Sequence, residues 1–168
     1  MADAPDTEQR LRALEERVAL LEDQLALYRL VSTYGPAVDT GSGNEAAELW
    51  AEDGAYEFDT SRLDGPEGIS AMVAGETHQG LIHQGCAHVL ALPVLTVDGD
   101  EAQATGYSRV YRHVGDGYEV WRVSANHWRF RRTPDGWRVT HRVNRTLDGS
   151  PEARAILRRA FGESTRET

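Results

Sequence analysis

The sequence predicts one α+β domain in which helices from the N-terminal half cover a curved antiparallel sheet. The chain has 168 residues, about the length of one domain, and 40% of them are hydrophobic, which allows one sizeable core. Apolar residues recur at helical spacings in the first half, whereas from His88 onward they alternate with a period of two. One predicted strand spans residues 118–130 and should curve strongly, so that a cavity forms between helices and sheet.

The N-terminal region is predicted to form a long helix after a short tail. Residues 1–10 are polar and contain Pro5, which is typical of a disordered tail. From there the apolar positions are spaced alternately by three and four, as in the seam of an amphipathic helix formed by Leu11, Leu14, Val18, Leu21 and Leu25. Because an isolated helix of this length is only marginally stable, the seam is expected to pack either on the protein's own body or on another subunit.

The helical pattern continues to Asp39, with one expected irregularity. Gly35 and Pro36 predict a kink or a restart near Tyr34, because proline lacks the N–H group that would close the helical hydrogen-bond ladder. Such a bend would allow Tyr34 and Asp39 to face one pocket. On a straight helix these two residues lie roughly 140° apart.

Shorter elements are expected between this helix and the sheet. Asn44 is suited to cap a helix over residues 45–53, which would be followed by a strand over residues 55–60. A further helix is predicted over residues 66–75, with proline at its first position and glycine at its end. The histidine-containing segment 75–88 is rich in glycine and is expected to be a loop.

The second half is predicted to be an antiparallel meander. Turn sequences DGD, GDG and TPDG separate four candidate strands, over residues 88–97, 103–114, 118–130 and 136–143. Pro93 lies inside the first of them and implies an edge position or a bulge. We therefore expect a single domain over residues 11–150, followed by a C-terminal helix and tail over residues 151–168.

Composition and charge argue against several classes of protein. The chain has 18 basic and 27 acidic residues and a net charge of -9, which disfavours nucleic acid as a partner. No apolar stretch is long enough to span a membrane, and no signal peptide can be identified, so we expect a cytoplasmic protein. Cys86, the lone cysteine, cannot form a disulfide within the chain.

A small set of polar residues could carry acid–base chemistry. Tyrosine can donate a hydrogen bond to a carbonyl, histidine titrates near neutral pH, and a carboxylate can orient a histidine. These properties suit proton abstraction beside a carbonyl group, and the candidate residues are Tyr34, Asp39, His88, Ser124, Asn126 and His127. The residues alone leave an alternative open, in which Tyr34 is a core tyrosine and Asp39 is a helix cap.

Metal, cofactor and thiol chemistry are not expected. Histidines 78, 83 and 88 recur every five residues, but this is not a recognised spacing for metal ligands. No glycine-rich phosphate loop is present, so neither a nucleotide nor another organic cofactor is implied. No motif around Cys86 would activate it as a nucleophile.

Four segments together resemble the SnoaL-like branch of the nuclear-transport-factor-2-like superfamily, which includes scytalone dehydratase and bile acid 7-alpha-dehydratase. The segments are residues 11–39, 48–59, 88–111 and 128–142. The resemblance implies a cone-shaped curved sheet wrapped by N-terminal helices. It also implies a homo-oligomer, either a dimer or a trimer.

The resemblance further implies roles for individual residues. Tyr34 and Asp39 match the cone-lining tyrosine and aspartate of the dehydratases, and His88 matches their catalytic histidine. Asn126 and Ser124, in the string SANHW, match a stretch that contacts substrate in scytalone dehydratase.

Two departures from the pattern accompany these matches. Phe58 falls near a second catalytic tyrosine of scytalone dehydratase, and no histidine aligns with that enzyme's second one, although His113 lies close. A scytalone substrate is therefore not expected. Trp50, Phe58 and Trp128 are expected to form apolar walls that bind substrate.

The sequence thus leads to a cofactor-free dehydratase or isomerase that acts on a hydrophobic cyclic carbonyl compound, steroid-like or polyketide-like, through Tyr34, Asp39 and His88. One alternative is a polyketide cyclase or an epoxide-opening enzyme of the same fold. An epoxide hydrolase would need paired carboxylates around an arginine, and no such cluster is evident. Another alternative is a non-catalytic module that binds a small molecule.

Overall fold

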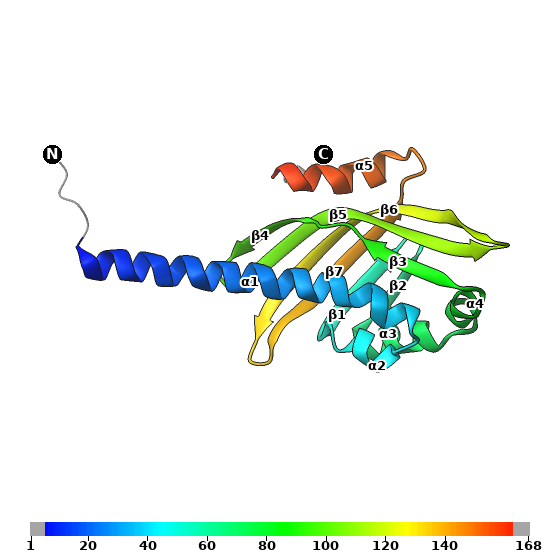
Figure 1. Ribbon diagram of the computed structural model, residues 1–168, viewed down its shortest axis with the longest axis horizontal. Helices are drawn as coiled ribbons and strands as arrows, with labels where there is room; N and C mark the ends of the chain where they lie inside the picture. Colours follow the sequence, from blue (N-terminus) through cyan, green and yellow to red (C-terminus); the bar gives the residue numbers. More distant parts are fainter. Residues whose placement is uncertain (1–5, 163–168) are drawn as a thin grey trace.

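A computed structural model describes residues 6–162 of the chain and confirms an α+β fold. Four helices from the first half of the chain lie against one face of a curved seven-stranded sheet, and a C-terminal helix lies on the other face (Figure 1). The N-terminal part of the first helix extends well beyond the body of the molecule. No described helix is long and apolar enough to cross a lipid bilayer.

Helix α1 spans Thr7–Asp39, so the structure corrects the predicted start of the helix. Asp6 and Gln9 form a capping box, in which each side chain accepts a hydrogen bond from the backbone of the other residue. This cap makes residues 7–10 helical rather than part of a tail, while residues 1–5 lie outside the described range. The helix passes through Pro36 without a restart.

The polypeptide after α1 differs from the prediction where the sheet begins. Helix α2 is only Gly43–Ala47, and the expected helix over residues 45–53 is wrong because strand β1 starts at Trp50 and spans Trp50–Phe58. Pairing with the last strand of the sheet overrides the local helical pattern here. Strand β2, Ser61–Asp64, then forms an antiparallel hairpin with β1.

Two helices precede the main part of the sheet. Helix α3 spans Gly65–Ala74 and confirms the predicted helix with proline near its start. Helix α4 spans Glu76–Gln84, so the segment expected to be a glycine-rich loop is largely helical. Gly75 and Gly85 lie at its two ends rather than within it, and a single internal glycine, Gly80, is tolerated.

The remaining strands confirm the predicted meander, and the three predicted turns join them. They are β3 (Cys86–Leu90), β4 (Val94–Asp98), β5 (Glu101–Val114), β6 (Gly117–Thr133) and β7 (Gly136–Thr146). The predicted strand 88–97 is divided at Pro93, and both of its parts pair with β5 at the edge of the sheet.

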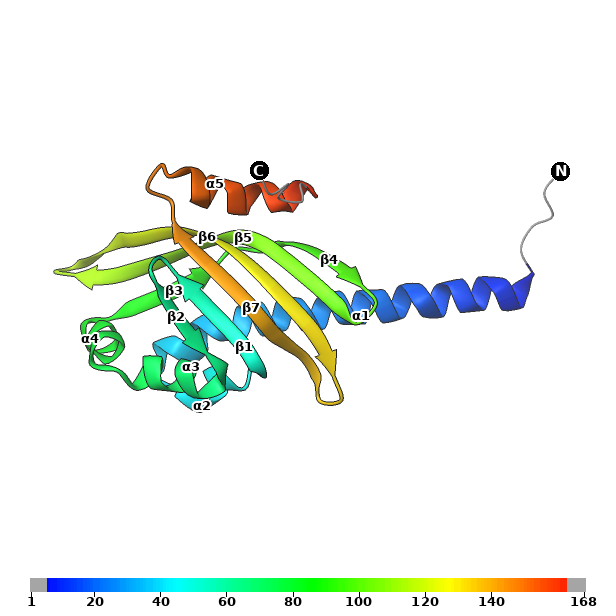
Figure 2. The same cartoon turned by 180° about the vertical axis from the view of Figure 1, so that it is seen from behind.

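The strand order is β2-β1-β7-β6-β5-β3, with β4 also beside β5 (Figure 2). Strand β1 runs parallel to β7, whereas all the other pairs are antiparallel. The sheet is therefore mixed rather than purely antiparallel. No local pattern predicts the parallel pairing, because β1 and β7 are joined through the whole intervening chain rather than by a turn.

The two faces of the sheet bury different residues. Alternate residues of β6, including Ser124, Asn126 and Trp128, point to the face that the first four helices cover. The other face carries helix α5, Pro151–Arg158, whose Ala153 and Ile156 pack on Ala125. A short 3₁₀ turn, Arg159–Phe161, follows, and the rest of the expected C-terminal tail lies outside the described residues.

Candidate functional site

A cavity of about 310 Å³ lies between the sheet and the helices α1, α3 and α4. One part of its wall is apolar and includes Phe58, Met72, Leu81, Leu90, Val110 and Trp121. The other part is polar and contributes hydroxyl, imidazole, amide and guanidinium groups from Tyr34, His78, His88, Ser108, Arg122, Ser124, Arg142 and Asn144. An apolar pocket with a few convergent polar groups is typical of a small-molecule site. Neither Asp nor Glu is among the described residues that line it.

Asp39 and His88 form a hydrogen-bonded pair at the edge of this cavity. The His88 Nδ1 atom lies 2.5 Å from Asp39 Oδ1, and the His88 backbone N–H donates to Asp39 Oδ2 at 2.6 Å. A carboxylate oxygen can only accept, so Nδ1 carries the proton and Nε2 is left as the basic nitrogen of the neutral ring. The structure thus brings together two residues that are 49 positions apart.

The environment of Asp39 favours its ionised form. Burial alone would raise the pKa of Asp39, but the hydrogen bonds from the side chain and backbone of His88 and the charge of that ring together lower it. Asp39 is itself absent from the cavity wall, whereas His88 lines it. The carboxylate therefore lies behind the imidazole, in the position of a residue that orients a base.

The thiol of Cys86 donates to the same carboxylate, at a distance of 3.4 Å. Asp39, Cys86 and His88 each have one ligand atom within 4.8 Å of the others, a spacing that could hold a metal ion. However, burial and the nearby Asp39 raise the pKa of Cys86 to about 11, which disfavours the thiolate that metals require. The hydrogen bonds among these groups instead indicate an acid–base pair.

Tyr34 lies on α1, lines the same cavity and is buried. Burial is the main reason that the pKa of Tyr34 is raised above its usual range; the neighbouring Tyr56 adds to this, and the positive charge of Arg142 opposes it. The phenol therefore stays protonated at neutral pH and can donate a hydrogen bond. Pro36, two residues further along, does not remove Tyr34 from the pocket.

Arg142 is a residue of the cavity wall that the sequence analysis did not identify. Its guanidinium carbon lies 4.2 Å, 4.4 Å and 4.1 Å from the ring centres of Tyr34, Tyr56 and Trp128. The side chain is only 2% exposed. The alternating pattern of its strand does not predict that Arg142 is buried, because its burial depends on rings from three distant segments.

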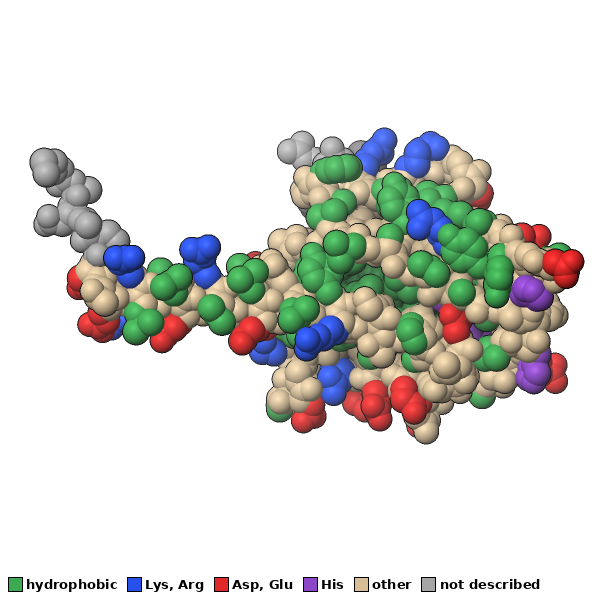
Figure 3. Space-filling view, in the orientation of Figure 1, with side chains coloured by type: hydrophobic (Ala, Val, Ile, Leu, Met, Phe, Trp, Pro, Cys, Tyr) green, Lys and Arg blue, Asp and Glu red, His purple; other side chains and the backbone are tan. Residues whose placement is uncertain are grey.

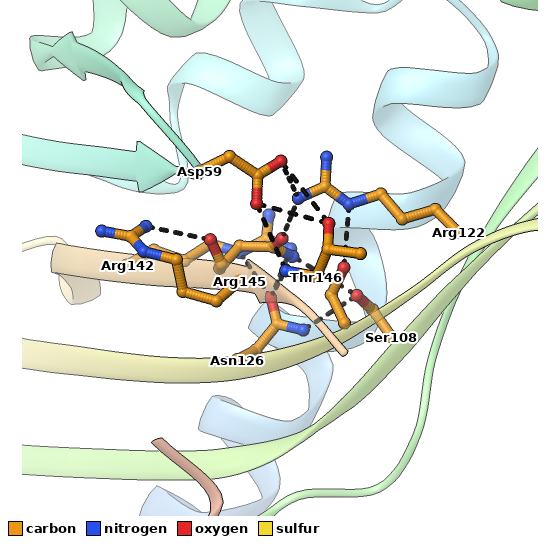
Figure 4. Close-up of polar contacts among 9 residues, drawn as sticks. Asp59, Ser108, Arg122, Asn126, Arg142, Arg145 and Thr146 are labelled. Atoms are coloured by element: carbon orange, nitrogen blue, oxygen red, sulfur yellow. Dashed lines mark hydrogen bonds and ion pairs between the residues drawn. The ribbon is translucent and has the colours of Figure 1, made fainter. Parts of the chain in front are cut away.

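A polar network connects the floor of the cavity across β5, β6 and β7 (Figure 4). Asn126 Oδ1 accepts hydrogen bonds from Arg142 and from Asn144, and Asn126 Nδ2 donates to Ser108. Arg122 donates to Ser124 and Asn144, and its Nη2 also forms an ion pair of 2.9 Å with Asp59. Such a connected network holds its side chains in fixed orientations.

The residues predicted to bind substrate fall into two groups. Phe58 and Ser124 are part of the cavity wall. Trp50, Asn126 and Trp128 are buried behind it, where Trp50 and Trp128 pack around Tyr34 and Asn126 belongs to the polar network.

The remaining histidines have separate surroundings. His78 lines the cavity, and its ring centre lies 5.5 Å from that of His88, while its Nε2 donates to the Val38 carbonyl oxygen at 2.8 Å. His113 packs against Tyr118 and lies outside the cavity wall. His127 is buried on the strand β6, and its Nδ1 lies 2.9 Å from the Thr105 hydroxyl.

Comparison with known proteins identifies the family and the fold. The model of the SnoaL-like domain family matches residues 19–143. An NTF2-like protein with a cystatin-like fold from Novosphingobium aromaticivorans is 42% identical, with a TM-score of 0.86 over 92% of this chain and 99% of that one. No curated protein matches this chain.

More distant solved structures share the fold. A protein of unknown function from Mycobacterium tuberculosis is 23% identical, with a TM-score of 0.69 over 89% of this chain and 88% of that one. An NTF2-like superfamily protein from Salmonella enterica is 15% identical, with a TM-score of 0.61 over 74% of this chain and 91% of that one.

Proposed function

The chain belongs to the SnoaL-like domain family, and on this premise we propose that it is a cofactor-free dehydratase or isomerase of a hydrophobic cyclic carbonyl compound. The observation that supports this most strongly is the His88 ring, which faces the cavity while its Nδ1 is held by Asp39. A steroid-like or polyketide-like compound fits the apolar part of the wall.

The reaction begins with removal of a proton from the carbon next to the substrate carbonyl. His88 Nε2 takes this proton, and Asp39 stabilises the imidazolium that results. The electron pair of the broken C–H bond moves onto the carbonyl oxygen, which becomes an enolate oxygen. Tyr34, which is buried in the cavity wall, donates a hydrogen bond to that oxygen.

The second step decides between the two reactions. In dehydration the enolate expels a hydroxyl group from the next carbon, the imidazolium gives that group its proton, and water and an unsaturated ketone are the products. In isomerisation the same proton returns to a different carbon of the conjugated enolate. Both routes share the first step, so an assay of proton removal tests the proposal whichever product is formed.

Exchange of the α-protons of cyclic ketones in deuterated water, followed by NMR, is that assay. We expect wild-type protein to accelerate exchange with hydroxylated and unsaturated multi-ring ketones. His88→Ala should lower the rate by about 10²–10⁴-fold, since a positioned general base contributes about that factor. Tyr34→Phe should lower it by about 10²–10³-fold, the range for loss of one oxyanion donor.

His83→Ala is the matched control, because His83 lies on α4 outside the cavity wall and should leave the rate unchanged. Exchange at the wild-type rate in a folded His88→Ala variant would contradict the mechanism. Ketone binding without any exchange would favour the non-catalytic binding module. Ring closure would be recognised by its product, and epoxide opening is disfavoured because no carboxylate lines the described cavity.

We further propose that the protein acts in the cytoplasm as a homo-oligomer. A reducing compartment fits the single Cys86, which has no second cysteine in this chain to pair with. The exposed apolar residues on the first half of α1 support assembly.

A further inference from the structure

We propose that the cavity binds a cyclic carbonyl compound that also carries a carboxylate, and that Arg142 is the residue that binds this group. The inference deepens the proposed function and rests on it for the use of the cavity. It identifies the chemical class of the ligand, which the acid–base pair alone does not.

The positive charge of Arg142 is not balanced by a carboxylate of the described residues. The side chain is 2% exposed, and arginine is almost never buried so completely without an acidic partner. Among the described residues no carboxylate lies within ion-pair distance of it. The cavity wall therefore holds a positive charge that a ligand carboxylate would balance.

One N–H donor of Arg142 has no acceptor in the described structure. Arg142 Nε and Nη2 both donate to Asn126 Oδ1, at 3.1 Å and 2.8 Å, whereas Nη1 is buried and has no hydrogen-bond partner in the described structure. The guanidinium is planar, so Nη1 lies on the edge away from Asn126. A buried N–H group without an acceptor is destabilising, and a ligand oxygen would remove that cost.

Three aromatic rings surround the guanidinium group of Arg142. Tyr34, Tyr56 and Trp128 hold its carbon at 4.1–4.4 Å from their ring centres. These contacts attract the cation and fix its orientation. The group is thus held in place before a ligand binds, which lowers the entropic cost of recognition.

Arg122 also lines the cavity, but its charge is already balanced. Its Nη2 lies 2.9 Å from the Asp59 carboxylate and 2.7 Å from Asn144 Oδ1, and its Nε donates to Ser124. Arg142 is therefore the cation in the described wall that is available to an anionic ligand.

Isothermal titration with two nearly isosteric compounds tests this. Naphthalene-2-carboxylate and 2-acetylnaphthalene share the ring system and the carbonyl, and a methyl group in the second replaces the charged oxygen. We expect wild type to bind the acid at least about tenfold more tightly, as for a charged hydrogen bond. The ratio should fall to about one in Arg142→Met and be partly kept in Arg142→Lys.

Arg138→Met is the control, because it removes a cation from the same strand but outside the cavity wall, and it should keep the wild-type ratio. Equal binding of the two compounds by wild type would overturn the inference even if Arg142→Met failed to fold. A preference for the acid that persists in folded Arg142→Met would also overturn it.

The measurement separates this inference from the proposed function because it records binding and not turnover. His88→Ala should keep the preference for the acid. Acid preference in a protein without any exchange activity would remove the dehydratase proposal alone, and exchange activity without acid preference would remove the Arg142 inference alone.

An independent observation concerns α1, and from it we infer that the first half of this helix forms a parallel two-stranded coiled coil with a second copy of the chain. Figure 3 shows apolar side chains along the part of the helix that extends from the body. The five seam residues are 49–62% exposed although they are leucines and a valine, at positions Leu11, Leu14, Val18, Leu21 and Leu25.

The seam faces away from the protein's own body. Residues of α1 that are buried in the core, such as Leu27, Leu30 and Val31, lie roughly 120–160° around the helix from the seam at 3.6 residues per turn. A partner helix can therefore reach the seam without displacing the core. One seam row contains Leu11, Val18 and Leu25 and the other contains Leu14 and Leu21, which is the spacing of a coiled-coil seam.

The flanking charges identify the partner and its direction. In the heptad set by the seam, Arg10 and Arg17 occupy one flank, and Glu15 and Glu22 occupy the other. In a parallel pair of identical helices each residue of the first flank meets the residue five positions later in the partner, so Arg10 faces Glu15 and Arg17 faces Glu22. An antiparallel pair would instead place like charges together.

Two of these four charges have no partner on their own helix. Neither Arg17 nor Glu22 has an opposite charge three or four positions away on its own helix, and neither forms an ion pair with any described residue. A second copy of the chain supplies the complementary charges for both.

Sedimentation equilibrium of charge-reversed variants tests the inference. Wild type should have twice the monomer mass of 18.6 kDa. Both Arg10→Glu/Arg17→Glu and Glu15→Arg/Glu22→Arg should be monomers, since each places like charges across the seam, and an equimolar mixture of the two should again be dimeric. A monomeric wild type, or reversed variants that remain dimers, would overturn the inference.

Direction is tested by air oxidation of Thr7→Cys, which extends the seam by one position. A parallel pair brings the two introduced thiols together and should give a covalent dimer. Gln9→Cys places the thiol on the outer face of the helix and is the control, with Cys86 present in both variants. Equal cross-linking of the two variants would exclude the parallel arrangement.

Discussion

At the scale of single residues, the Asp39 carboxylate accepts hydrogen bonds from both the backbone N–H and the side chain of His88. The backbone bond places the start of β3 against the end of α1, and the side-chain bond sets which ring nitrogen is free. A mutation of Asp39 should therefore affect both the position of β3 and the protonation of the base. Asn at this position could still accept from the backbone but would not stabilise the imidazolium.

Buried His127 gives a residue-scale prediction for stability against pH. Burial, with the charges of Arg159 and Arg129, lowers the pKa of His127 from 6.5 to about 4. Between these values the unfolded chain binds a proton that the folded chain excludes, so the stability contributed by neutral His127 is complete above pH 6.5 and is lost as the pH falls towards 4.

Urea unfolding of wild type and His127→Gln at several pH values measures this effect. The stability of wild type relative to the variant should fall by up to about 3 kcal/mol between about pH 7 and about pH 4, from about 1.36 kcal/mol per pKa unit. Parallel stability curves for the two proteins would show that His127 does not titrate in this way.

At the scale of elements, helix α1 has two parts with different surroundings. Its second half carries Tyr34 and Asp39 and packs on the sheet, while its first half is exposed throughout residues 6–22. Asp23 marks the transition, since it accepts hydrogen bonds from Arg132 and Trp137 of the β6–β7 hairpin. These hydrogen bonds fix where the helix leaves the body.

The contact between α1 and β3 depends on Gly35. A Cβ atom at this position would lie 2.2 Å from the carbonyl oxygen of His88, closer than any real contact. Gly35→Ala should therefore separate the two elements, lower stability by about 1–3 kcal/mol as in overpacked cores, and reduce the rate of α-proton exchange. Chemical denaturation and the exchange assay measure the two effects.

Gly80→Ala is the matched control for this prediction. Gly80 also lies within a helix, α4, but a Cβ atom there would have no neighbour within 4 Å. Alanine should stabilise this helix by up to about 1 kcal/mol. A Gly35→Ala variant as stable as Gly80→Ala would mean that β3 can shift without cost.

At the scale of the whole molecule, the sheet separates two environments. The face under α1–α4 contains the cavity and the buried cation Arg142, and the other face is covered by α5 through a small apolar cluster. The net charge of -9 repels an anionic ligand at long range, so the proposed binding of a carboxylate depends on the local field of Arg142 in the cavity wall.

The whole molecule also sets the geometry of the proposed dimer. A parallel coiled coil places both bodies at the same end, beyond Leu25, where α1 turns its buried face to its own sheet. The described residues that line the cavity all lie outside the seam of α1, so a substitution in the seam leaves the cavity wall unchanged. Assembly and ligand binding are thus separable in experiments.

Elements whose signals are local can be predicted from the sequence. The seam of α1, the helix α3 and the three hairpin turns of the sheet follow from spacing and turn residues, which act over a few positions. The resemblance to a family added Tyr34, Asp39 and His88 as a group. Their chemical types alone left a structural alternative open.

Features that depend on partners far apart in the chain become visible only in the folded molecule. The parallel pairing of β1 with β7 turned a helical pattern at Trp50 into a strand, and the rings of Tyr34, Tyr56 and Trp128 made Arg142 a buried cation. The direct hydrogen bonds that join Asp39 to His88 form only because α1 lies across β3. Such contacts join segments far apart in the chain, and their energies arise from burial and pairing that no local pattern encodes.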